Sequence, residues 1–161
     1  MKNIAVITPY NNENYDIIKK ANLSVLQQEG GEFNCAHIII VDGKDKNNNL
    51  SKLKCHKIEL DRNYNDNGNM PRSIGTKYAI NNKFDFIMYL DADNWFLNDH
   101  IVSLINLIND QNHIACSYRS FYTFDEKKMS YIEDDDCLSK KFVDTSCYLI
   151  PKLFLIPISE S

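Results

Sequence analysis

Short runs of apolar residues alternate along this chain with segments in which apolar residues recur at helical spacing. The runs have the length of buried strands, and we expect strands over residues 3–8, 36–41, 55–60, 84–90, 113–120 and 142–150, with a hairpin over 122–131. The helical spacing predicts helices over residues 15–28, 71–82 and 98–108, and a short helical turn near 50–53. Alternating strands and helices are typical of an α/β fold with a mainly parallel central sheet and helices on both faces.

The predicted element boundaries depend on capping residues and prolines. Asn14 and Asn98 can act as N-caps, Pro71 suits the first position of the second helix, and Pro9 is expected to end the first strand. The buried stripes of the first and third helices are expected to comprise Ile17, Ile18, Ala21, Val25 and Leu26, and Ile101, Leu104, Ile105 and Ile108.

The bulk composition indicates one globular domain. The chain has 161 residues, 43% hydrophobic and 25% charged, with a net charge of −4, and so lacks the basic surface that nucleic-acid binding requires. Its five cysteines include no C-x-x-C pair, which favours reduced, buried thiols and a cytoplasmic location. Neither a signal peptide nor an apolar run of membrane-spanning length is predicted.

Two polar features follow the first two predicted strands. After the first strand comes Thr8-Pro9-Tyr10, in which Tyr10 can offer a ring for a nucleobase and Thr8 a hydroxyl. After the second comes Asp42, whose carboxylate can accept a hydrogen bond from a base or a ribose. A turn-forming Asp-Gly is an equally good interpretation of Asp42 taken alone.

Two further features belong to the middle of the chain. The segment 71–75 places Arg72 in the first turn of a helix, where free N–H groups and the guanidinium both suit phosphate. The apolar run 84–90 ends in Asp91-Ala92-Asp93, a carboxylate pair suited to a hard divalent cation. A surface arginine and a solvated acidic turn are the alternative interpretations.

The four features together match the requirements of a nucleoside diphosphate with a divalent cation, Mn²⁺ or Mg²⁺. All of them lie at the carboxyl ends of predicted strands or in the adjoining connections, so they should converge in space. No G-x-G-x-x-G follows the first strand and no G-x-x-x-x-G-K-[ST] occurs, which argues against a dinucleotide fold and a P-loop.

The same four motifs, in this order and spacing, resemble those of family 2 glycosyltransferases with the GT-A fold. The resemblance covers residues 3–120 and rests on the segments 7–11, 39–43, 71–75 and 90–94. It implies an inverting, metal-dependent transfer of sugar from a UDP- or GDP-linked donor to a saccharide or glycan-lipid acceptor. By position, it implies nucleotide contacts by Thr8, Pro9, Tyr10, Asp42, Arg72 and Asp91, and metal binding by Asp93 and Asp91.

The catalytic base is the part of this resemblance that has no clear counterpart. Asp144 is a candidate, although an acid that supports a loop or strand edge explains it at least as well. The acidic segment 133–136 is expected to be a solvated loop or a weak cation site. We therefore expect a single domain, with residues 1–120 as the donor-binding half and residues 121–161 as a partial acceptor-side segment.

Three functions remain open from the sequence. The first is an active glycosyltransferase, and the second a nucleotide-sugar-binding module or truncated, inactive transferase. The third is a phosphohydrolase with an Asp-X-Asp motif, which is disfavoured because about 90 residues precede the motif here. The apolar tail 153–156 is expected to contact another subunit or the inner face of a membrane.

Overall fold

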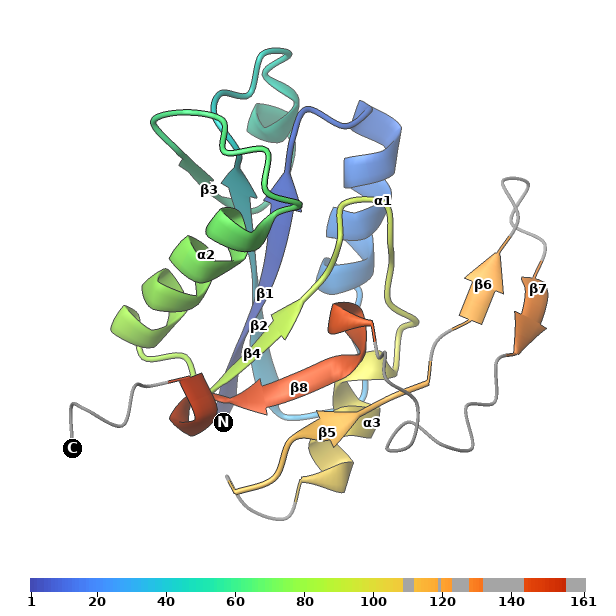
Figure 1. Cartoon of the computed structure of the whole chain (residues 1–161). Helices are drawn as coiled ribbons and strands as arrows, with labels where there is room; N and C mark the ends of the chain where they lie inside the picture. Colours follow the sequence, from blue (N-terminus) through green and yellow to red (C-terminus); the bar gives the residue numbers. More distant parts are fainter. Residues whose placement is uncertain (109–111, 119, 123–127, 132–143, 156–161) are drawn as a thin grey trace.

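The computed structural model of the chain describes residues 1–108, 112–118, 120–122, 128–131 and 144–155 (Figure 1). These residues form a six-stranded sheet in the order β3-β2-β1-β4-β8-β5 and a separate hairpin of β6 and β7. The strands are β1 (Lys2–Tyr10), β2 (Phe33–Val41), β3 (His56–Glu59), β4 (Phe86–Tyr89), β5 (Ala115–Cys116), β6 (Ser120–Tyr122), β7 (Lys128–Tyr131) and β8 (Tyr148–Pro151).

The first four strands in the chain, β1 to β4, are parallel, as predicted. β1 pairs with β2 on one side and β4 on the other, and β3 extends the sheet beyond β2. β8 runs antiparallel to β4, and β5 antiparallel to β8. The chain therefore moves outward from β1 to β3 and then returns to place β4 on the opposite side of β1. Such a reversal leaves a crevice at the carboxyl ends of the two strands, where α/β proteins bind ligands.

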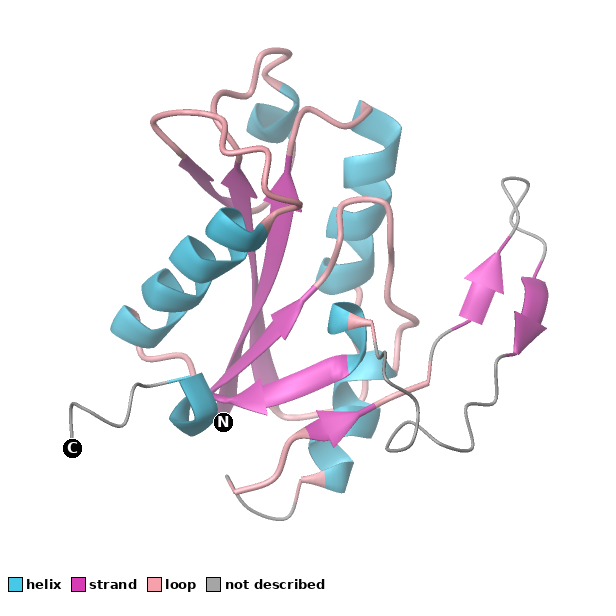
Figure 2. Ribbon diagram, in the orientation of Figure 1, coloured by secondary structure: helices cyan, strands magenta, loops and turns pink. Residues whose placement is uncertain are grey.

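Helices cover both faces of this sheet, which confirms the predicted layers (Figure 2). α2 packs on one face, and α1 and α3 pack on the other. The helical elements are α1 (Tyr15–Leu26), α2 (Asn69–Asn81), α3 (His100–Leu107) and the 3-10 turns η1 (Asn49–Lys52), η2 (Thr145–Cys147) and η3 (Lys152–Leu155). None of the helices within the described ranges is long and apolar enough to cross a membrane.

The continuous apolar run of β1 is explained by burial of both its faces. Ile4 and Val6 point into the cluster under α1 and α3, and Ala5 and Ile7 into the cluster under α2. Pro9 does not end this strand, contrary to expectation. The Tyr10 carbonyl accepts from the Asp42 N–H, so Tyr10 points its backbone groups toward β2. The neighbouring residue, Pro9, therefore points its nitrogen toward the other side, where β4 has already ended opposite Ile7. No N–H is needed there, and the strand can continue through proline.

The helix α1 begins as predicted and buries a slightly different face. The Asn14 side chain caps it by accepting from the Asp16 N–H at 2.9 Å. Ile17 and Leu26, expected in the buried stripe, are 39% and 40% exposed. The buried face instead includes the polar residues Asn22 and Ser24, which are satisfied by hydrogen bonds in the interior.

The N-cap of the helix α3 lies one residue later than expected. Asp99, not Asn98, occupies the N-cap position, and its side chain makes no capping bond. The Ile101 N–H is satisfied instead by Gln28 Oε1 at 2.8 Å, a partner far away in the sequence. The apolar stripe is largely as predicted, because Ile101, Leu104 and Ile108 are buried in the core and Ile105 packs against it.

The last third of the chain differs most from expectation. The predicted strand 113–120 is reduced to β5, and residue 120 already belongs to the expected hairpin of β6 and β7. Of the predicted strand 142–150, residues 148–150 belong to β8 and residues 145–147 form η2, while residues 142 and 143 lie outside the described residues. The acidic segment 133–136 lies outside the described residues.

A buried histidine joins three elements beneath the sheet's carboxyl edge. His37 is 2% exposed, and its Nε2 lies 2.8 Å from Thr8 Oγ1 and its Nδ1 2.9 Å from Asn22 Nδ2. An amide nitrogen only donates, so Nδ1 accepts and Nε2–H donates to Thr8. Burial lowers the pKa of His37 to about 3, so the ring is neutral.

This histidine predicts a loss of stability in weak acid. The unfolded chain protonates His37 below about pH 6.5, whereas the folded chain does so only near the lowered pKa of about 3. The free energy of unfolding should therefore fall as the pH drops from 6.5 to 5, with His37 contributing up to about 1.4 kcal/mol per pH unit. Urea unfolding of wild type and His37→Gln should show the smaller slope in the variant, with exposed His56→Gln as the matched control. Equal slopes for wild type and His37→Gln would contradict this role.

Candidate functional site

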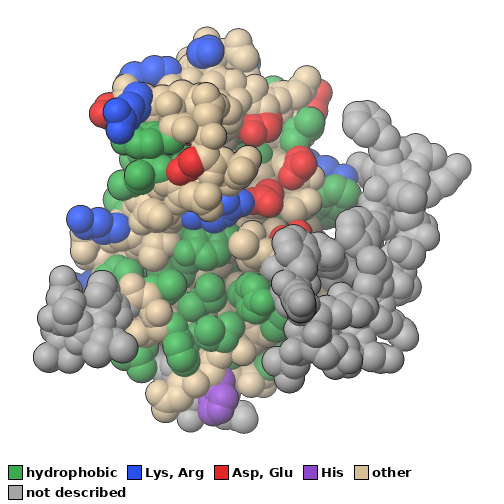
Figure 3. Space-filling model, viewed as in Figure 1, with side chains coloured by type: hydrophobic (Ala, Val, Ile, Leu, Met, Phe, Trp, Pro, Cys, Tyr) green, Lys and Arg blue, Asp and Glu red, His purple; other side chains and the backbone are tan. Residues whose placement is uncertain are grey.

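A cavity of about 440 Å³ opens at the carboxyl edge of the sheet, where β1 and β4 diverge. Figure 3 shows acidic side chains gathered on this part of the surface, with a hydrophobic area beyond them. The residues that line the cavity are Pro9, Tyr10, Asn11, Glu13, Asp42, Asn65, Asn67, Gly68, Pro71, Arg72, Asp91, Ala92 and Asp93. Six of the seven predicted nucleotide and metal residues therefore meet in one place, and Thr8 does not line the cavity.

Asp91 and Asp93 differ in their surroundings. The strand β4 ends at Tyr89, the next residue, Leu90, is fully buried, and the Asn94 N–H closes a turn onto the Asp91 carbonyl at 3.0 Å. Buried Ala92 separates the two carboxylates. Asp91 is ion-paired with Arg72, whereas Asp93 is exposed and has no ion pair or hydrogen bond to other described residues.

Arg72 reaches the cavity from α2 and is held by two contacts. Its Nη2 pairs with Asp91 Oδ1, and its Nη1 donates to the Asn67 carbonyl at 2.8 Å. The side chain is only 19% exposed, so the guanidinium is held at the cavity wall and does not extend into solvent. The alternative of a free surface arginine is thereby excluded.

The start of α2 does not offer free N–H groups, contrary to expectation. The helix begins at Asn69, two residues before Pro71. Asp66 satisfies the first N–H groups: its carbonyl accepts from the Asn69 N–H, and its Oδ2 accepts from the Met70 N–H at 2.7 Å. Because Pro71 has no N–H, the guanidinium of Arg72 and not the helix terminus is available to an anion here.

Asp42 holds the loop that forms one wall of the cavity. It is 5% exposed, and its Oδ1 and Oδ2 accept from the N–H groups of Tyr64 and Asn65 at 2.8 and 3.0 Å. This loop continues to Asn67, whose carbonyl anchors Arg72. The Asp42 carboxylate therefore organises this loop wall, in addition to lining the cavity itself.

Tyr10 does not present a ring for stacking, contrary to expectation. It is 1% exposed, and its ring packs in the core beneath α1. Its hydroxyl donates to the Glu13 carbonyl and accepts from Asn49 Nδ2, both at 3.2 Å. Burial raises the pKa of this hydroxyl.

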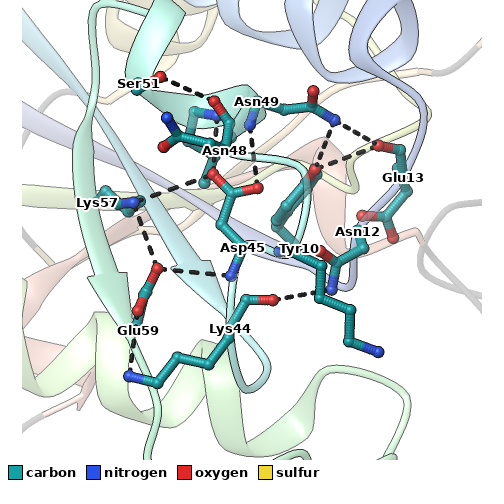
Figure 4. A network of polar contacts seen from close by, with 12 residues as sticks. Tyr10, Asn12, Glu13, Lys44, Asp45, Asn48, Asn49, Ser51, Lys57 and Glu59 are labelled. Carbon is teal, nitrogen blue, oxygen red and sulfur yellow. Dashed lines mark hydrogen bonds and ion pairs between the residues drawn. The ribbon is translucent and has the colours of Figure 1, made fainter.

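The contacts of Tyr10 belong to a polar network that fixes the loop after β2 (Figure 4). Asp45 accepts from the N–H groups of Asn49 and Leu50 and so caps η1. Asn12 ties this loop to the turn after β1, since it bonds to the Lys44 carbonyl and the Lys46 N–H. The network therefore gives the turn that carries Asn11 and Glu13 a fixed position at the cavity.

Thr8 and Asp144 have structural contacts. Thr8 is fully buried, and its hydroxyl bonds to His37 beneath the cavity. Asp144 caps η2, with its Oδ1 accepting from the Ser146 N–H at 2.9 Å. The turn η2 lies near Asp91 and Asp93, because the Nδ2 atom of the adjacent Asn94 is 3.5 Å from Ser146 Oγ. Asp144 thus supports a loop beside the site, as its alternative interpretation predicted.

Sequence reasoning missed the asparagine-rich wall of the cavity. Asn65 and Asn67 line it and have positive φ values of 51° and 58°. Asparagine tolerates this conformation better than most residues, so the asparagine-rich stretch 63–69 indicates a tight, ordered loop. Its place at the cavity follows only from the hydrogen bonds to Asp42.

The charge of the cavity suits a cation. Among the described residues four carboxylates line it, those of Glu13, Asp42, Asp91 and Asp93, against the single guanidinium of Arg72. Within the described residues no group of three or more histidine, cysteine, aspartate or glutamate side chains could form a complete protein cage for a metal ion. Two carboxylates nevertheless fit Mg²⁺ or Mn²⁺ that takes its other ligands from water and phosphate.

Comparison with known protein families identifies one match. The family model described as Glycosyl transferase family 2 matches residues 5–148, which include every cavity residue. No curated protein matches the chain.

Solved structures of S. aureus TarS resemble the fold. TarS aligns with a TM-score of 0.54 at 20% sequence identity, covering 69% of this chain and 20% of that chain. TarS 1-349 in complex with UDP-GlcNAc gives the same TM-score and identity, covering 68% of this chain and 31% of that chain. The likeness confirms the expected GT-A-like fold, and the chain spans between a fifth and a third of the TarS chains.

Proposed function

Since the chain belongs to glycosyl transferase family 2, we propose that its cavity binds a nucleoside diphosphate sugar and that the protein transfers the sugar to an acceptor hydroxyl. The observation that carries the proposal is the meeting of Arg72, Asp91 and Asp93 in one cavity at the point where the strand order reverses. A phosphohydrolase is disfavoured further by the family to which the chain belongs.

The proposed donor is a UDP-sugar, with GDP as the alternative base. TarS, which shares the fold, has been solved in complex with UDP and with UDP-GlcNAc. In this chain the nucleoside would lie toward Asp42 and the loop of Asn65, because the diphosphate must lie at Arg72 and the acidic pair. The buried ring of Tyr10 leaves base recognition to hydrogen bonds and to the walls of the cavity.

A divalent cation, Mn²⁺ or Mg²⁺, is proposed at Asp93 and Asp91. A diphosphate would be repelled by a cavity with four carboxylates and one guanidinium unless a cation offset them. When bound, the cation supplies charge neutralisation of the leaving diphosphate. Asp93 is exposed and free to bind it, and Asp91 lies beside it in the same turn.

The proposed chemistry is a direct displacement that inverts the anomeric centre. Arg72 stabilises negative charge as it develops on the diphosphate, and its fixed position avoids reorganisation during the reaction. A general base must deprotonate the acceptor hydroxyl on the opposite face of the sugar. Asp144 is a weak candidate for that base, because its carboxylate already caps η2.

The commitment of Asp144 to a capping bond favours a second candidate function, a nucleotide-sugar-binding module without transfer. In either case the proposed acceptor or partner is a saccharide or glycan-lipid, at the cytoplasmic face of a membrane. Leu153 and Phe154 of η3 are 55% and 48% exposed and would provide the apolar contact.

The two candidates are separated by measuring binding and turnover in the same preparation. Thermal shift and calorimetry with UDP and GDP, with and without Mn²⁺, should show stabilisation that requires both the nucleotide and the cation. Release of UDP from UDP-sugars, with and without added saccharide acceptors, then tests for transfer. Binding without turnover would favour the module, and absence of any nucleotide binding would refute both candidates.

A further inference from the structure

The ion pair between Arg72 and Asp91 joins the two halves of the proposed site. Among the described residues, Arg72 is the only basic one that lines the cavity, and Asp91 is one of two carboxylates at its acidic turn. The residues that would bind the diphosphate and the cation thus bind each other. The contact should therefore affect the binding of both ligands, an expectation that rests on the proposed function.

The surroundings of Arg72 hold it at this carboxylate. Its Nη1 is anchored by the Asn67 carbonyl at 2.8 Å, and Gly68, next in the loop, lies against the guanidinium. Glycine is favoured here because φ is +78° and an added Cβ would lie 2.9 Å from Pro9 Cβ and 3.0 Å from Arg72 Nη1. The Nε atom is buried and lacks a hydrogen-bond partner among the described residues.

The shape of the guanidinium favours phosphate over its present partner. Its Nη2 bonds to a single carboxylate oxygen, Asp91 Oδ1, whereas the planar fork matches the oxygens of a phosphate group. Asp91, at 36% side-chain exposure, can reach a cation once its oxygen is released. Asp93 has no such competing contact among the described residues.

We propose that the Arg72–Asp91 ion pair couples cation binding to diphosphate binding through an exchange of partners. In the ligand-free chain Arg72 neutralises Asp91 and so weakens the site for a cation alone. A diphosphate gives Arg72 a new partner, which releases Asp91 for the cation. The two ligands therefore raise each other's affinity by the same factor, as linkage requires.

The exchange makes a prediction that a scaffolding role for the same ion pair does not. If Arg72 only holds Asp91 in position, its removal should weaken cation binding or leave it unchanged. If Arg72 competes for Asp91, Arg72→Ala should bind Mn²⁺ alone more tightly than wild type. In the same variant, the gain in Mn²⁺ affinity on adding UDP should shrink by about tenfold.

Calorimetric or electron paramagnetic resonance titration of Mn²⁺, with and without saturating UDP, measures both quantities without reference to activity. Lys77→Ala is the matched control, since it removes one exposed positive charge from the same helix away from the cavity lining. Lys77→Ala should leave the Mn²⁺ affinity and the UDP coupling as in wild type.

The outcomes distinguish this inference from the proposed function. If wild type binds no UDP in the presence of Mn²⁺, the proposed function fails. If wild type binds both, and Arg72→Ala binds Mn²⁺ alone equally or more weakly or retains the full coupling, the exchange is overturned. Tighter Mn²⁺ binding in Lys77→Ala as well would attribute the effect to net charge and would also overturn it.

Discussion

Replacing Asp93 by alanine is expected to abolish Mn²⁺-dependent nucleotide binding while leaving the fold intact. Asp93 is the exposed member of the acidic turn and has no ion pair or hydrogen bond to other described residues. Its removal therefore leaves no buried partner unsatisfied, and the unfolding temperature without ligand should stay close to that of wild type.

The expected loss of binding is large because the site has little redundancy. The cavity is lined by three other carboxylates, of which Asp42 is bonded to the loop N–H groups and Asp91 to Arg72. Glu13 accepts from the Asn11 N–H at 2.7 Å. With Asp93 removed, UDP affinity in the presence of Mn²⁺ should fall by at least about 100-fold, roughly 2.7 kcal/mol.

Calorimetry with UDP, with and without Mn²⁺, measures the effect directly. Glu32→Gln, which removes an exposed carboxylate away from the cavity lining, is the matched control and should bind as wild type does. Asp93→Ala protein that keeps Mn²⁺-dependent UDP binding would refute the assignment of the cation to this turn.

The parts of the fold and site that sequence predicted are those controlled by local pattern. A run of apolar residues that ends in Asp91 and Asp93 predicts a buried strand that delivers acids to the sheet edge, and the structure has this arrangement. The Asn14 cap was predictable for the same reason, since the cap and its N–H partner are two residues apart.

The parts that sequence did not predict depend on contacts between distant residues. Tyr10 buries its ring in the core and bonds its hydroxyl to Asn49, 39 residues away. Asp42 binds the N–H groups of Tyr64 and Asn65, more than 20 residues away, while it lines the cavity. The cap of α3 comes from Gln28, 73 residues away. No local propensity encodes such partners, so the roles of these side chains were accessible only from the folded chain.

Replacing Gly75 of α2 by alanine should destabilise the protein. This is the opposite of the usual effect, because alanine in place of a glycine inside a helix normally raises the free energy of unfolding. Gly75 lies in the middle of this helix, where alanine normally gains about 0.5–1 kcal/mol. A Cβ at this position would lie 2.5 Å from Ile7 Cγ2 and 3.2 Å from Ile40 Cγ1. Both isoleucines are fully buried in β1 and β2, so neither can move aside without displacing the central sheet.

Gly75→Ala should therefore lower the free energy of unfolding by about 3 kcal/mol and the unfolding temperature by roughly 6–12 °C. Ser73→Ala, an exposed position on the same helix, is the matched control and should change stability by no more than about 0.5 kcal/mol. Urea and thermal unfolding measure both variants, and a Gly75→Ala protein as stable as wild type would show that α2 is not held against Ile7. Because Arg72 is anchored one turn earlier on this helix, UDP affinity should fall together with stability in Gly75→Ala and be unchanged in Ser73→Ala.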